Sequence, residues 1–166
     1  MSAVAERVLE LAVGFIGVRE ATGNNDGEPM RLFMNGESVP GSDGKIGYAW
    51  CAAFVTKVFQ LAGCPLPGNQ RKIWAVEEMF QQLAKKKAGR QIGDARGGDL
   101  AILPRGKALH GHVELVTGLA FNEETKLLEL RTIGGNVADQ VARRVHHFEM
   151  VRGEPVPHVA IMRWPV

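Results

Sequence analysis

The chain has 166 residues, of which 45% are hydrophobic and 23% charged, and its net charge is +2. These values are ordinary for a globular protein, and the charge is too small to favour a nucleic-acid partner. The length predicts a single domain over residues 1–166 with its own core. No stretch approaches the roughly 20 apolar residues that span a bilayer, and charged residues interrupt the apolar pattern of residues 1–17. We therefore expect synthesis in the cytoplasm without a signal peptide, and no membrane insertion.

The first half of the chain has the spacing of helices. The segment 48–63 is apolar on most sides, so it predicts a buried central helix that carries Cys51 in its first turn. Gly63 and the prolines after it predict its end. Three further helices are expected over residues 2–16, with Ser2 as the cap, 29–34 and 69–87.

A polar, turn-rich loop is expected over residues 17–28. Its carboxylate and amide oxygens are of the kind that bind Ca²⁺, but their spacing is not that of an EF-hand loop. We therefore expect an ordinary loop, no metal and no cofactor, with Ca²⁺ as the less favoured alternative.

The second half of the chain has the alternation of strands. Hairpin-length connections favour an antiparallel sheet, and helices followed by strands indicate an α+β fold with the helices packed on about five strands. The strands are expected over residues 98–104, 111–118, 126–133, 141–148 and 158–164.

Cys51 is a candidate nucleophile. At a helix N-terminus, unpaired N–H groups and the helix dipole favour the thiolate, and the same N–H groups can hold an oxyanion. The alternative is a small buried apolar residue, which most free cysteines are. A disulfide between Cys51 and Cys64 is not expected, because a helix would hold the two residues roughly 20 Å apart.

A nucleophilic cysteine needs a base, and the base needs an orienting group. Among five histidines, His112 is best placed, since it begins a strand that can face a helix N-terminus. His146 and His147 are adjacent in a strand and must point to opposite faces. Asn136 ends the next strand and could accept the His112 ring N–H, as in Cys-His-Asn enzymes. A structural histidine and a turn asparagine are the alternatives.

Four motifs follow one another along the chain: Trp50-Cys51-Ala52-Ala53-Phe54-Val55, Gly98-Asp99, Gly111-His112-Val113 and Gly134-Gly135-Asn136. In this order they resemble the CHAP family of cysteine peptidoglycan hydrolases, and the related NlpC/P60 group shares the layout.

The resemblance implies a papain-like α+β fold and hydrolysis of a peptidoglycan amide, either N-acetylmuramoyl-L-alanine or a stem or cross-bridge peptide bond. Cys51 would be the nucleophile, His112 the base and Asn136 the orienter, with Tyr48 and Trp50 as candidate oxyanion or substrate-binding residues. Many CHAP enzymes carry a glutamate two residues before the asparagine, where this chain has Gly134. Asn136 would therefore act alone or with another group.

Several functions fit this resemblance. The chain could be a phage endolysin or an antibacterial effector with an immunity protein, acting in the periplasm or cell wall after delivery by a holin, a secretion system or a phage particle. A peptide or acyl transferase would use the same three residues. A structural or binding module, such as a phage tail component, would keep the fold without turnover.

Overall fold

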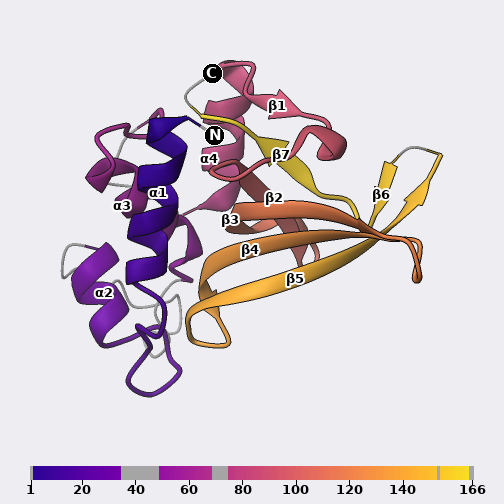
Figure 1. Ribbon diagram of the computed structural model, residues 1–166. Coiled ribbons are helices and arrows are strands. Elements are labelled where there is room, and N and C mark those ends of the chain that lie inside the picture. Colours follow the sequence, from indigo (N-terminus) through magenta and orange to yellow (C-terminus); the bar gives the residue numbers. More distant parts are fainter. Residues whose placement is uncertain (1, 35–48, 69–74, 153, 165–166) are drawn as a thin grey trace.

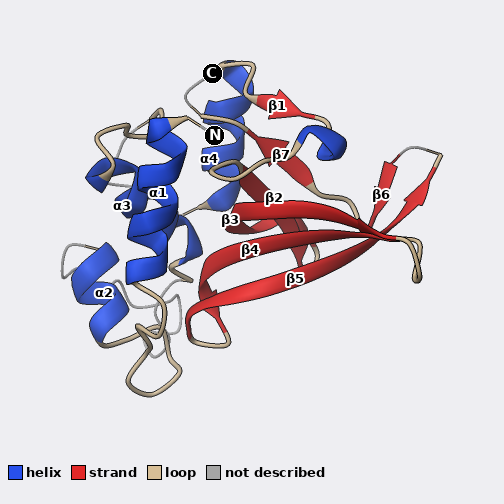
Figure 2. Cartoon of the chain, viewed as in Figure 1, coloured by secondary structure: helices blue, strands red, loops and turns tan. Residues whose placement is uncertain are grey.

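A computed structural model describes residues 2–34, 49–68, 75–152 and 154–164, arranged as helices on one side and strands on the other (Figures 1 and 2). The helices are α1 (Ala3–Gly14), α2 (Glu28–Phe33), α3 (Cys51–Leu61) and α4 (Val76–Lys85), with a 3-10 turn at Ile92–Asp94. The strands are β1 (Gly89–Arg90), β2 (Leu100–Arg105), β3 (Ala108–Asn122), β4 (Leu127–Val137), β5 (Gln140–Val151), β6 (Glu154–Val156) and β7 (Ala160–Met162).

The strands form one antiparallel sheet in the order β1-β7-β2-β3-β4-β5-β6. This confirms the predicted α+β fold and its five main strands. The sequence analysis missed β1 and β6, which are two and three residues long and too short to show an alternating pattern. The expected start of the third helix, residues 69–74, lies outside the described residues.

Local sequence signals explain where α1 and α3 begin and end. The Ser2 side chain caps α1 by accepting a hydrogen bond from the Ala5 N–H at 3.3 Å, as predicted. Helix α3 begins at Cys51 and is followed by Gly63, whose φ of +75° ends the helical path at little cost. None of the helices in the described ranges is long and apolar enough to cross a bilayer.

Helix α3 is the centre of the fold. Eight of its eleven residues are buried, and it packs against α1 and α2 on one side and against β3 and β4 on the other. The approach of α3 to β4 is so close that a Cβ at Gly135 would lie 2.6 Å from the Cβ of Phe54. A glycine is required there, and it fixes the start of α3 beside the end of β4.

Side chains of β3 alternate between two environments. Val113 and Leu115 pack in the core that the sheet shares with the helices, whereas Val116 belongs to a second core with residues of β4, β5 and β7. His112 and Glu114 lie two residues apart, so they project from the same face of β3. The strand therefore presents an imidazole and a carboxylate side by side.

Candidate active site

The site begins at Cys51, the first residue of α3. Backbone N–H groups of Ala52 in the helix and of Val113 in β3 donate hydrogen bonds to its sulfur. Both interactions favour the thiolate over the thiol. Only 1% of the residue is exposed, so a substrate reaches the sulfur only when neighbouring atoms move.

His112 of β3 lies beside this sulfur, and 5% of the residue is exposed. Its Nε2 lies 2.9 Å from Oε1 of Glu114, while its side chain also interacts with the Cys51 thiol. The other ring nitrogen, Nδ1, is buried and makes no well-aligned hydrogen bond within the described residues. With Nε2 held by the carboxylate, Nδ1 is the nitrogen left to exchange a proton with the sulfur.

The electrostatics favour a thiolate–imidazolium pair. Burial alone lowers the pKa of His112, but its interactions with Cys51 and Glu114 outweigh burial and raise the pKa from 6.5 to about 9. Burial raises the pKa of Cys51, yet His112 and the two N–H groups lower it below its ordinary value of 9.0. Proton transfer from Cys51 to His112 therefore separates charge inside a site that stabilises both ions.

Glu114 is completely buried, and its carboxylate interacts with several hydrogen-bond donors at once. Besides His112, it accepts a hydrogen bond from the Thr132 hydroxyl, lies 2.7 Å from Nε2 of His146, and has the Arg144 guanidinium at 3.5 Å. Burial raises the pKa of this carboxyl, but the hydrogen bonds from His112, His146 and Thr132 hold it well below its usual value. Glu114 is therefore a carboxylate with fixed orientation, which is what a catalytic histidine needs on its far nitrogen.

The sequence of residues 43–136, more than half of the chain, matches the CHAP domain family. The chain belongs to the CHAP family. This membership indicates a function related to peptidoglycan.

A similar solved structure is RipD (Rv1566c) from Mycobacterium tuberculosis, described as a non-catalytic NlpC/p60 domain protein adapted to peptidoglycan binding. The two structures share a TM-score of 0.51 and 18% sequence identity over 99% of each chain, so the likeness shows the fold alone. No curated protein matches the sequence significantly. The structure is thus a papain-like α+β fold of the CHAP and NlpC/P60 kind.

In this CHAP domain the contact predicted between Asn136 and His112 is made by Glu114 instead. The Asn136 side chain donates its amide N–H to Oδ1 of Asn25 at 2.7 Å, and its φ is +56°. Asparagine tolerates this left-handed backbone better than most residues, which accounts for its place at the end of β4. Asn136 lies near the site, on the same groove as His112, but it does not orient the ring.

The sequence analysis missed Glu114, although the signal was available. The His-Val-Glu spacing puts the imidazole and the carboxylate on one face of a strand that was correctly predicted. The predicted partner was instead on the following strand, where Gly134 stands in place of the expected glutamate. In the sheet, Gly134 is the residue directly opposite Glu114.

Trp50 does not fit the predicted role in oxyanion or substrate binding. Its side chain is fully buried, stacks on Phe33 with ring centres 5.6 Å apart, and donates its indole N–H to Glu20 at 2.6 Å. It anchors the start of α3 to the loop after α1, because Glu20 also accepts the Asn25 N–H at 2.7 Å. Tyr48, the other candidate, lies outside the described residues.

The remaining histidines have other partners or none among the described contacts. His110 stacks on Phe80, and its Nδ1 lies 2.7 Å from the Glu77 carboxylate. His147 lies 3.6 Å from Glu129, whereas the adjacent His146 contacts Glu114. The two neighbours therefore point to opposite faces of the strand, as predicted. Both cysteines are free.

The loop expected over residues 17–28 uses its carboxylates internally. Asp26 accepts hydrogen bonds from the backbone N–H groups of Ala21 and Thr22 and from the Thr22 hydroxyl, and these bonds lower its pKa. No group of three or more His, Cys, Asp or Glu side chains with metal-site geometry is found in the part of the chain that the structure describes.

Proposed function

We propose that this CHAP domain is a cysteine hydrolase that cleaves an amide bond of peptidoglycan. The observation that supports it best is the linked set of Cys51, His112 and Glu114: a thiol at a helix N-terminus beside an imidazole whose far nitrogen is held by a buried carboxylate. A core that merely needed packing would not bury a carboxylate against two histidines, because the charges are costly to desolvate.

The reaction follows the roles of these groups. The Cys51 thiolate adds to the amide carbonyl, and N–H groups at the start of α3 hold the resulting oxyanion. The His112 imidazolium gives its Nδ1 proton to the leaving amine, so the C–N bond breaks and a thioester remains on Cys51. Neutral His112 then takes a proton from water, the hydroxide oxygen attacks the thioester, and the carboxylic acid and the thiol are released. Glu114 keeps Nδ1 aimed at the sulfur throughout.

The test is turnover on purified peptidoglycan, with the products identified by mass spectrometry of the soluble muropeptides. Cys51→Ala and Cys51→Ser should abolish release, while Cys64→Ser, the matched change at the other free thiol, should retain it. Mass spectrometry distinguishes N-acetylmuramoyl-L-alanine cleavage from stem or cross-bridge cleavage, and it separates hydrolysis from a transferase that would join the acyl group to an amine. Wild-type turnover by Cys51→Ala would refute the nucleophile.

A second candidate function is peptidoglycan binding without turnover. Two observations favour it: Cys51 is only 1% exposed, and RipD, which has a similar fold, is described as non-catalytic. This candidate predicts that wild type and Cys51→Ala sediment equally with insoluble peptidoglycan and that neither releases soluble products. Release by the wild type alone would exclude it.

A hydrolase of this kind acts in the periplasm or cell wall. We therefore propose delivery by a holin, a secretion system or a phage particle, as an endolysin or an effector. If it is an effector, an immunity protein that protects the producing cell is the partner to expect.

A further inference from the structure

A groove of about 620 Å³ opens beside His112. It is lined by residues from the end of β2, from β3, from the turn after β4 and from β5. Asn136 lies in the wall next to His112, and Phe148 of β5 gives part of the floor an apolar surface. The groove therefore reaches the imidazole that would protonate a leaving group, and Cys51 itself is not among the residues that line it.

The polar lining of this groove is basic. Arg105, Arg144, His146 and His147 face it together with His112, and no aspartate or glutamate is among the described residues that line it. The guanidinium of Arg105 is exposed and has no ion-pair partner within the described residues. This local excess of positive charge contrasts with a net charge of only +2 for the whole chain.

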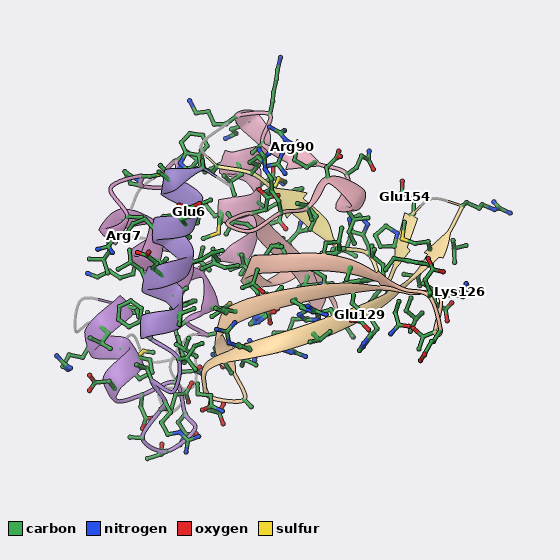
Figure 3. All side chains as sticks on the ribbon, in the orientation of Figure 1. Glu6, Arg7, Arg90, Lys126, Glu129 and Glu154 are labelled. Atoms are coloured by element: carbon green, nitrogen blue, oxygen red, sulfur yellow. The ribbon has the colours of Figure 1, made fainter. Side chains whose placement is uncertain are left out.

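Within the described part of the chain, nearby carboxylates pair with each basic residue of this lining except Arg105. Glu114 lies behind His112, fully buried, and its charge is shared among His112, His146 and Arg144. Glu129, which is labelled in Figure 3, lies on β4, and its carboxylate is 3.6 Å from Nε2 of His147. No carboxylate is left for Arg105, so an incoming anion would not have to displace a protein carboxylate from it.

We propose that this groove binds free carboxylates of the peptidoglycan stem peptide, close to the amide to be cut. The inference rests on the proposed function and names the substrate form: stems whose carboxyl groups are free rather than converted to amides. Arg–carboxylate pairs are short, planar and often bidentate, whereas a carboxamide offers one acceptor oxygen, no charge and an NH₂ donor that the guanidinium cannot accept. Arg105 is therefore a specificity-determining residue, separate from the groups that carry out the reaction.

The experiment measures binding in Cys51→Ala, which keeps the groove but lacks the nucleophile. The probes are the synthetic stem L-alanyl-γ-D-glutamyl-L-lysyl-D-alanine and the same peptide with the glutamyl α-carboxyl as its amide, titrated by calorimetry. We expect the free acid to bind about tenfold more tightly, which is the effect of one charge-assisted hydrogen bond. Adding Arg105→Gln should lower affinity for the free acid about tenfold and remove the discrimination.

Arg143→Gln is the matched control. It removes the same charge from an exposed position on β5, next to Arg144 but outside the groove lining, and should leave both affinities unchanged. Equal affinity for the two peptides, or equal effects of Arg105→Gln and Arg143→Gln, would overturn the proposal. So would a groove that prefers a polyglycerol phosphate to the free-acid peptide, because the anion recognised would then be a wall phosphate.

Failure of the proposed hydrolase and failure of the groove give different results. If Cys51→Ala discriminates between the two stems but the wild type releases no soluble muropeptide from purified peptidoglycan, the groove proposal stands and the hydrolase does not. If the wild type releases soluble muropeptides from purified peptidoglycan but Cys51→Ala binds the two stems equally, the hydrolase stands and the groove proposal falls. Melting temperatures of all variants confirm that each one is folded.

Discussion

Glu114→Gln is the sharpest test of the site, because it removes one charge and keeps the side-chain shape. The rise in the pKa of His112 from 6.5 to about 9 corresponds to about 3 kcal/mol in favour of the imidazolium. Cys51 makes the larger contributions to that rise and Glu114 the smaller ones, so removing the carboxylate charge should remove part of it. The pKa of His112 should therefore fall toward its ordinary value in the variant, as followed by NMR titration of the imidazole.

The same substitution should slow turnover. Weaker stabilisation of the ion pair and loss of the fixed ring orientation should together lower kcat/KM by about 10²-fold or more. The assay is release of soluble muropeptides under first-order conditions. Glu129→Gln is the matched control: it removes a carboxylate on the same sheet that lies 3.6 Å from a different histidine, His147.

The stability of Glu114→Gln should depend on pH in a defined direction. A histidine with a raised pKa in the folded state adds stability that is complete below pH 6.5 and disappears as the pH rises through about 9. A glutamate with a lowered pKa adds stability above pH 4.5 that is lost as the pH falls. The destabilisation measured by urea unfolding should thus be largest between about pH 4.5 and 6.5, should decline as the pH rises toward 9, and should be small near pH 10. An unchanged pKa of His112, together with activity equal to that of Glu129→Gln, would refute the role of Glu114.

Three further changes test the surrounding geometry. In Gly134→Ala the new Cβ would lie 2.7 Å from Cγ of Glu114, so urea unfolding should show a loss of about 1–3 kcal/mol; a neutral result would mean that β3 and β4 separate easily. Asn136→Ala should cost about 1 kcal/mol by the same measurement and lower kcat/KM less than Glu114→Gln does, and the reverse order would restore Asn136 as the orienter. Iodoacetamide should label Cys51 faster than Cys64 near pH 7, as read by peptide mass spectrometry, because the pKa of Cys51 is lowered while burial raises that of Cys64; equal, slow labelling would contradict the ion pair.

The sequence predicted the fold well because its elements carry strong local signals. The apolar helix α3, the capped helix α1 and the long strands β3 to β5 were each recognisable from periodicity and breakers alone. Strands β1 and β6 were missed because two or three residues form strands through pairing with neighbours rather than through their own pattern. Their existence depends on tertiary contacts that no local window contains.

Only those site residues that have a local sequence signal could be predicted. Cys51 at a helix start and His112 in a strand were both named from sequence, and the structure places them side by side, although the strand begins at Ala108 rather than next to His112. The partner of Asn136 could not be found in this way, because Asn25 is 111 residues away and its position depends on how the loop after α1 folds back. Trp50 was misjudged because burial is a property of the packed chain, and a tryptophan beside a cysteine gives no sign of which way it points.

Strand pairing explains how the carboxylate can come from Glu114. Residues directly opposite one another on neighbouring antiparallel strands have Cβ atoms about 5 Å apart, so a long side chain from either one can reach the same point. Glu114 and Gly134 form such a pair, and the space that a Cβ at Gly134 would need is occupied by Cγ of Glu114. Position 134, two residues before Asn136, is a glycine, and position 114, two residues after His112, is a glutamate. The two are linked, because the Glu114 side chain occupies the space that a side chain at position 134 would need. Considered separately, the first suggests a site that lacks its carboxylate and the second an unremarkable strand residue; considered as a pair, they describe a histidine with a buried carboxylate partner.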